Sequence, residues 1–87
     1  MAKAKGLTVS RIATLVEKKD VGQHQAEQGA GFGRLLAEEL RKRGFRPVES
    51  YSKCDVADFE CHLKKSGKSV EIISSCFMGV FTEVSWW

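Results

Sequence analysis

The sequence predicts a two-layer α+β domain, with one or two helices packed on one face of a mainly antiparallel sheet of three or four strands. Three observations predict this class. Residues 32–44 have the apolar spacing of an amphipathic helix, residues 56–75 resemble two alternating strands joined by a tight turn, and residues 80–87 alternate again. The expected element order is α-α-β-β-β-β in one domain over residues 1–87, with residues 1–6 as a flexible lead.

The composition is that of an ordinary globular protein, with 43% hydrophobic and 29% charged residues in 87. The net charge of +3 permits contact with nucleic acid or acidic proteins without arguing for either. Because no apolar run approaches the length of a membrane span and no signal-peptide pattern opens the chain, we expect a cytoplasmic protein without a membrane partner. Three cysteines, an odd number, indicate free thiols in a reducing compartment.

Residues 7–21 fit two interpretations. Val9, Ile12 and Val16 follow helical spacing, whereas the many β-branched residues favour a strand. The length of the segment and the charges at 17–19 favour the helix. Residues 22–31 are polar and glycine-rich, which predicts a loop or a weakly helical connector. The glycines at 29–33 lack the preceding strand and the Gly-Lys-Ser/Thr of a phosphate-binding loop, so we interpret them as a flexible helix start or a close helix contact.

Residues 32–44 form the clearest helix. Its predicted apolar stripe comprises Phe32, Leu35, Leu36 and Leu40. Gly44 supplies a left-handed cap, Phe45 the hydrophobic contact after it, and Pro47 blocks continuation. Residues 45–52 are then expected to form an edge strand, because Pro47 cannot donate a ladder hydrogen bond.

The hairpin in residues 56–75 has a register that the sequence specifies. Ser66 and Gly67 form the two-residue turn, which places Lys65 opposite Lys68. The expected pairs are Leu63 with Val70, Cys61 with Ile72 and Phe59 with Ser74 on the core face, and His62 with Glu71 and Glu60 with Ile73 on the other face. A slip of one residue would bury the charged set, so the register is well determined.

The register of the last strand, residues 80–87, stays open. A simple hairpin turning at residues 78–79 places Val84 and Trp86 on the charged face, beside Ile73. A single bulge moves both of them to the core face instead.

The order helix, strand, strand with Asp58 and strand with Glu71 resembles the front half of the PD-(D/E)xK nuclease core. The resemblance covers residues 33–75 and implies that Asp58 and Glu71 bind a divalent metal and position water, with Glu38 or Glu39 as the helix glutamate. The sequence departs from the family pattern at Ile73, where the family has lysine, and it lacks the helix that follows the third strand. We therefore expect a solvated sheet face, no catalytic residues and no enzyme activity.

Neither a zinc site nor another cofactor site is predicted. The available ligands, which lack Cys-x2-Cys or His-x3-His spacing, are His24, Cys54, Cys61, His62 and Cys76. Because Cys61 and His62 are adjacent on a strand, they point to opposite faces, which also disfavours a Cys–His nucleophile.

Two binding functions are expected instead. The Trp86-Trp87 pair ends the chain, and at most one of two adjacent strand tryptophans can face the core, so the other is exposed or buried in a partner. The leading hypothesis is a small non-enzymatic module that docks stoichiometrically on a protein partner, as an inhibitor, adaptor or homodimer. Its predicted contact residues are His62, Ile73, Phe81, Trp86 and Trp87.

The alternative function is nucleic-acid binding, with or without a vestigial nuclease site, through basic residues of the main helix and the hairpin turn. These residues are Arg34, Arg41, Arg43, Lys65 and Lys68. Acidic residues interleave with them along the helix, and no aromatic strand motif of the RNA-recognition type is present.

Overall fold

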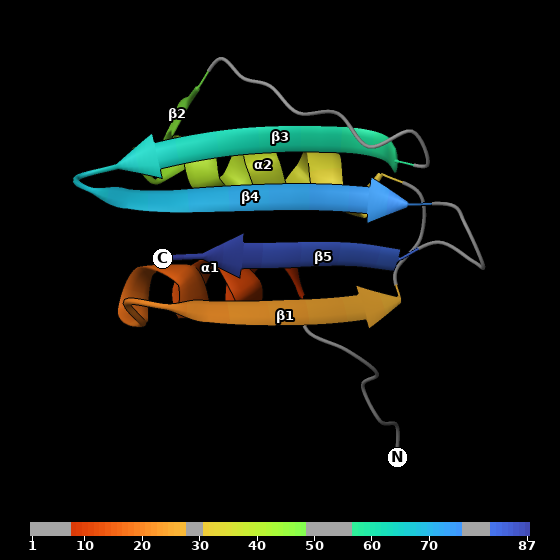
Figure 1. Ribbon diagram of the computed structural model, residues 1–87, viewed down its shortest axis with the longest axis horizontal. Helices are drawn as coiled ribbons and strands as arrows, with labels where there is room; N and C mark the ends of the chain where they lie inside the picture. Colours follow the sequence, from red (N-terminus) through yellow and green to blue (C-terminus); the bar gives the residue numbers. More distant parts are fainter. Residues whose placement is uncertain (1–7, 28–30, 49–56, 76–80) are drawn as a thin grey trace.

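Two helices cover one face of an antiparallel sheet in the computed structural model, which describes residues 8–27, 31–48, 57–75 and 81–87, of which residues 26, 27, 57 and 58 are described by backbone alone. The elements in chain order are α1 (Val9–Lys18), β1 (Gly22–Glu27), α2 (Phe32–Lys42), β2 (Arg46–Pro47), β3 (Ala57–Lys65), β4 (Lys68–Ser75) and β5 (Phe81–Trp86). The sheet order is β1-β5-β4-β3-β2 (Figure 1). This architecture confirms the predicted α+β class, with five strands in the described chain where three or four were expected.

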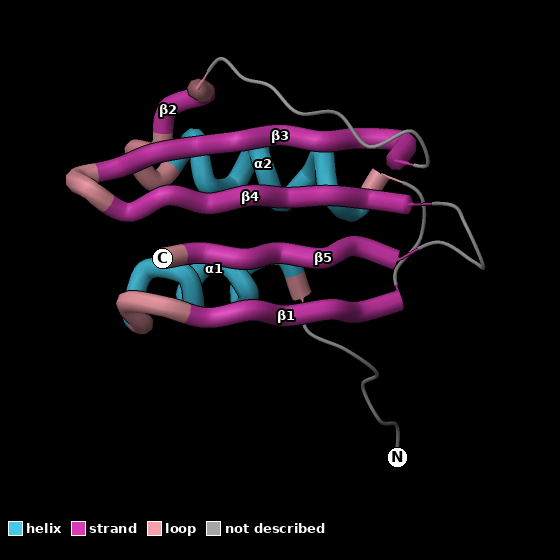
Figure 2. The backbone as a smooth tube through the Cα atoms, in the orientation of Figure 1, coloured by secondary structure: helices cyan, strands magenta, loops and turns pink. Residues whose placement is uncertain are grey.

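The helices lie side by side on the same face of the sheet. Figure 2 shows α1 behind β5 and β1, and α2 behind β3 and β4. The core between the two layers contains Ile12, Ala13, Val16, Leu36, Ala37, Leu40, Phe45, Leu63, Val70, Ile72, Val84 and Trp86. We call the opposite side of the sheet the outer face.

Within residues 7–21, for which the sequence fits both a helix and a strand, Val9–Lys18 form the helix α1. Thr8 caps α1, and its Oγ1 accepts a hydrogen bond of 3.2 Å from the Arg11 N–H. Ile12, Ala13 and Val16 are buried at helical spacing, so the amphipathic burial outweighs the strand preference of the β-branched residues.

The loop or weakly helical connector predicted for residues 22–31 is wrong over its first half, because Gly22–Glu27 form β1. This strand pairs antiparallel with β5, placing Gly22 opposite Trp86 and His24 opposite Val84. A Cβ atom on Gly22 would lie 2.6 Å from the Trp86 Cε2 atom, so the glycine makes room for an indole ring. The element order is therefore α-β-α-β-β-β-β.

The stripe that α2 buries matches the predicted one at Leu36 and Leu40, and Phe32 is partly buried against the core. Gly33, Leu36, Ala37 and Leu40 are buried, whereas Leu35 is 57% exposed. The reason is angular: at about 100° per residue the four buried residues lie within an arc of about 100°, and Leu35 lies about 150° around the helix from the centre of that arc. Gly33 lies against Ser74 and Phe59, which confirms the interpretation as a close helix contact at that residue.

The end of α2 has the predicted glycine cap. Gly44 has φ 103°, its N–H donates to the Arg41 carbonyl at 3.1 Å, and the Phe45 N–H donates to the Leu40 carbonyl at 3.0 Å. These two bonds are those of a Schellman motif. The following β2 is an edge strand, as Pro47 predicted, and pairs with β3. The remainder of the strand expected over 45–52 lies outside the described residues from position 49 onward.

The register predicted for the β3–β4 hairpin is confirmed at every pair. Lys65 lies opposite Lys68, Leu63 opposite Val70, and His62 opposite Glu71. Ser66 and Gly67 have φ of 49° and 85°, the two positive values that a type I′ turn requires.

The register of β5 resolves the open alternative in favour of the core face. Trp86 lies opposite Val70 and Val84 opposite Ile72, one residue offset from a two-residue turn at 78–79. Val84 and Trp86 are 1% and 2% exposed. The hypothesis that they join Ile73 on the charged face is therefore wrong, and Glu83 lies opposite Ile73 instead.

Candidate functional site

The outer face carries four of the five residues predicted to contact a protein partner. Its apolar residues are Ile73 on β4, Phe81 on β5, and Trp87 directly after β5. Ile73 and Phe81 are diagonal neighbours, because Ser75 lies opposite Phe81. Around them are half-buried polar side chains, including Glu60, His62, Glu71, Glu83 and Ser85. The carboxylates make the middle of this face acidic, although the whole chain has a net charge of +3.

The two terminal tryptophans have opposite environments. Trp86 lies in the core, and its indole Nε1 has no hydrogen-bond partner among the described residues. Trp87 is 54% exposed, and its backbone N–H and C=O pair with Ser69 at 3.0 and 2.9 Å. The ladder thus anchors Trp87 while its side chain stays accessible. The prediction that only one of the pair faces the core is confirmed, and Trp86 does not belong to the contact surface.

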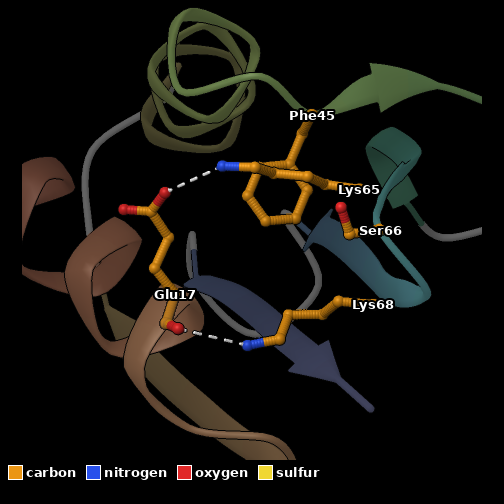
Figure 3. Close-up of a pocket in the computed structure, with 5 residues that line it drawn as sticks. All are labelled: Glu17, Phe45, Lys65, Ser66 and Lys68. Atoms are coloured by element: carbon orange, nitrogen blue, oxygen red, sulfur yellow. Dashed lines mark hydrogen bonds and ion pairs between the residues drawn. The ribbon is translucent and has the colours of Figure 1, made fainter.

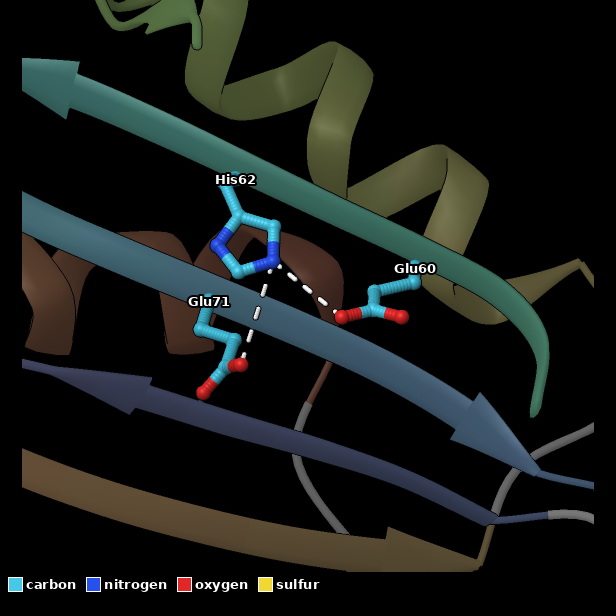
Figure 4. Close-up of side chains that lie close together, drawn as sticks. All are labelled: Glu60, His62 and Glu71. Atoms are coloured by element: carbon cyan, nitrogen blue, oxygen red, sulfur yellow. Dashed lines mark hydrogen bonds and ion pairs between the residues drawn. The ribbon is translucent and has the colours of Figure 1, made fainter. Parts of the chain in front are cut away.

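Three polar side chains converge near the middle of the outer face (Figure 4). The His62 Nε2 atom lies 3.2 Å from Glu60 Oε2 and 3.8 Å from Glu71 Oε2. Strand alternation predicted that Glu60, His62 and Glu71 share this face, and the hairpin register predicted the His62–Glu71 pair. The shorter contact between His62 and Glu60 was not predicted.

The two lysines of the hairpin turn donate hydrogen bonds to the ends of both helices. Figure 3 shows both lysines beside Glu17 of α1. Lys68 Nζ donates to the Val16 carbonyl at 2.5 Å and to the Lys19 carbonyl at 2.6 Å, at the end of α1. Lys65 Nζ donates to the Arg43 carbonyl at 2.7 Å, at the end of α2. Cations are favoured there because the last carbonyls of a helix lack internal partners. The turn borders a cavity of about 210 Å³ lined by Glu17, Phe45, Lys65, Ser66 and Lys68.

Arg43 joins α2 to α1 through a second set of contacts. Its guanidinium donates to Glu39 at 2.9 Å, to Glu17 at 3.0 Å and to the Thr14 hydroxyl at 3.3 Å. These carboxylates raise the pKa of Arg43, with Glu39 contributing most. In return, the hydrogen bond from Arg43, followed by that from Lys65, lowers the pKa of Glu17 below its ordinary value of 4.5.

The basic residues of the nucleic-acid hypothesis therefore differ in whether their charged groups already bind other parts of the protein. Arg43, Lys65 and Lys68 are donors within the protein. The guanidinium of Arg34 lies 4.7 Å above the Phe59 ring centroid, and Arg41 is exposed in the last turn of α2.

The helix glutamates of the nuclease-like set do not share a face with Glu71. Glu71 lies on the outer face, whereas α2, which carries Glu38 and Glu39, covers the other face. Glu39 is bonded to Arg43. The side chain of Asp58 lies outside the described part of the structure.

Cys61 is a free thiol, and burial raises its pKa. It lies on the face opposite that of His62, as predicted, and packs at the border of the core. The other two cysteines, at positions 54 and 76, lie outside the described residues.

The chain is thus a small two-layer α+β protein whose helices cover one face of its sheet. No protein-family model, curated protein or solved structure matches it. Among the described residues, neither helix combines the length and the apolar character needed to cross a lipid bilayer.

We expect Lys68→Met to lower the free energy of unfolding by about 1–3 kcal/mol, because the end of α1 loses hydrogen bonds from a charged donor. Urea denaturation followed by circular dichroism measures this. Lys64→Met is the matched control: this lysine is exposed on the outer side of the same hairpin, and its replacement should change stability by less than about 0.5 kcal/mol. Equal losses in both variants would contradict the capping role.

Glu17 should make the stability of the protein depend on pH. Its folded pKa is lowered, so its contribution to stability is present above its ordinary value of 4.5 and is lost as the pH falls through the lowered folded value. Glu17→Gln should therefore reduce stability at neutral pH and flatten the decline in stability below about pH 4.5. Urea midpoints at a series of pH values test this, with Glu38→Gln, an exposed α2 residue, as the control. An unchanged pH profile in Glu17→Gln would contradict it.

Proposed function

We propose that this protein is a non-enzymatic binding module that docks stoichiometrically on a protein partner through its outer face. The observation that supports it most is the 54% exposure of Trp87, a large aromatic side chain on a backbone anchored to β4. Tryptophan is strongly enriched among the residues that dominate protein interfaces. An anchored backbone reduces the entropy that the residue loses on binding.

The chemistry of the outer face defines the kind of partner. Ile73, Phe81 and Trp87 supply apolar contact area, and Glu71 and Glu83 lie between them on β4 and β5. Burying these carboxylates without a counter-charge would be unfavourable, so the partner surface must present basic groups to them. The partner is thus a protein surface that combines apolar and cationic residues.

The test compares outer-face variants with a variant on the helical side. Proteins that co-purify with the tagged chain from its native host are produced separately, and their binding to the purified chain is titrated by calorimetry. We expect saturable binding at a fixed stoichiometry that Trp87→Ala weakens by about 30-fold or more, corresponding to an interface residue worth at least about 2 kcal/mol. Ile73→Lys should weaken it as well, because it adds a positive charge opposite a basic partner.

Leu35→Ala is the control, because Leu35 is a comparably exposed apolar residue on α2. It should bind like the wild type. Wild-type affinity in Trp87→Ala and Ile73→Lys, or lost binding in Leu35→Ala, would contradict the proposal. Sedimentation of the chain alone over a range of concentrations distinguishes a second copy from a different partner.

The nucleic-acid alternative is tested on the purified chain and on variants of two of its exposed arginines. It predicts a salt-dependent mobility shift on duplex or single-stranded DNA that charge reversal at Arg34 and Arg41 abolishes. These two positions are suitable because they are exposed and lie outside the helix-end contacts.

A further inference from the structure

We propose that Glu60, His62 and Glu71 form a binding site for a divalent transition-metal ion of the zinc class on the outer face. The three residues come from adjacent antiparallel strands, and their ligand atoms all lie within 4.8 Å of one another. Figure 4 shows the imidazole of His62 directed toward both carboxylates. The site does not require a protein partner, and it shares His62 and Glu71 with the proposed docking surface.

The backbone fixes the positions of these ligands. Glu60 and His62 are two residues apart on β3, so they share a face, and Glu71 lies opposite His62 on β4. Both strands lie in the interior of the sheet order, between β5 and β2. The site therefore stands on rigid elements, and only side-chain rotation is needed to adjust it.

The distances from His62 to the two carboxylates are close to those around a bound ion, and the two carboxylates lie within 4.8 Å of each other. Zinc bonds to nitrogen and oxygen are about 2.0–2.2 Å, so two ligand atoms of a tetrahedral site lie about 3.3–3.5 Å apart. The His62 Nε2 atom is 3.2 Å from Glu60 Oε2 and 3.8 Å from Glu71 Oε2. Both distances are within about 0.5 Å of that range.

The charge of the cluster also favours a cation. Two carboxylates and one imidazole carry a charge of −2 when His62 is neutral and −1 when it is protonated. A divalent ion would balance both carboxylates and bind the neutral imidazole, which is the ligand form of histidine. The exposed fractions of the three side chains are only 16% for Glu60, 22% for His62 and 30% for Glu71, which limits competition from water.

The ligand set indicates the class of ion. An imidazole nitrogen favours zinc and neighbouring transition metals over magnesium and calcium, which prefer oxygen ligands. Three protein ligands leave one position of a tetrahedral ion open to water or to a group from solution.

The test titrates the chelator-treated full chain with zinc chloride by calorimetry and with Co²⁺ by visible absorption. We expect one ion per chain, a raised thermal midpoint, and a Co²⁺ spectrum without thiolate charge transfer. His62→Ala and Glu71→Gln should each lower the affinity by about 100-fold or more, since loss of a ligand exceeds the 10–100-fold typical of second-shell partners. Glu83→Gln, a carboxylate of the same face bonded to Gln23 at 2.8 Å, should retain wild-type affinity.

Three results would overturn the assignment: no saturable zinc binding by the wild type, equal affinity in the Glu71→Gln and Glu83→Gln variants, or a thiolate band in the Co²⁺ spectrum. Thermal denaturation without metal verifies that each variant is folded. If Glu71→Gln does not fold, Glu60→Gln provides the same comparison from the neighbouring strand.

Discussion

Replacing Trp86 with alanine is expected to lower the free energy of unfolding by about 3–5 kcal/mol. The indole is 2% exposed and lies between Val70 on β4 and Gly22 on β1. Gly22 has no side chain with which to fill the space that the ring would leave, so most of the cavity would persist. For 87 residues, ordinary stabilities are about 4–13 kcal/mol, so the variant should be largely destabilised or unfolded.

Trp87→Ala is the matched control for this result. Its side chain is 54% exposed, so its removal should change the free energy of unfolding by less than about 1 kcal/mol. Urea denaturation followed by circular dichroism measures both variants under the same conditions. Similar losses in the two variants would mean that the register of β5 is not the one described.

Gly33→Ala should be the next most damaging change, lowering stability by about 1–3 kcal/mol through overpacking. A Cβ atom at this position would overlap the Ser74 hydroxyl and lie 3.2 Å from Phe59 Cδ2. Ser74 cannot easily move away, because its Oγ is buried and lies 2.8 Å from Thr82 Oγ1. The better helix propensity of alanine, worth up to about 1 kcal/mol, offsets only part of this cost.

A double-mutant cycle tests whether the contact with Ser74 causes the loss of stability in Gly33→Ala. In a Ser74→Ala background the overlapping oxygen is absent, so the cost of Gly33→Ala should fall by about 1 kcal/mol. Glu38→Ala, an exposed substitution on the same helix, should remain within about 0.5 kcal/mol of the wild type. If the cost of Gly33→Ala is the same in both backgrounds, the contact with Ser74 is not what makes the glycine necessary.

Local patterns predicted the elements whose structure depends on neighbouring residues. The hairpin register follows from the Ser66-Gly67 turn and from alternation, and the end of α2 follows from Gly44 and Phe45. The strand β1 was missed because its sequence, Gly-Gln-His-Gln-Ala-Glu, has little strand propensity. It forms through pairing with β5, which is distant in the sequence.

In the candidate site, too, some features follow from local sequence patterns and others depend on tertiary packing. Alternation predicted that Ile73 and His62 share a face, and the hairpin register predicted that Glu71 joins His62. By contrast, Lys65 and Lys68 resemble any pair of surface charges in the sequence. Their role depends on where α1 and α2 end relative to the turn, and this is a property of tertiary packing.

Strand alternation alone establishes that Trp86 and Trp87 point in opposite directions, because adjacent strand residues always do. It did not determine which of them faces the helices, since a shift of one residue in the pairing of β5 exchanges the two. Pairing of Trp86 with Val70 and with Gly22 places its ring in the same core cluster as Ile12 and Val16 of α1. Burial of Val84 and Trp86 against the helices is the hydrophobic gain that favours this register over the alternative.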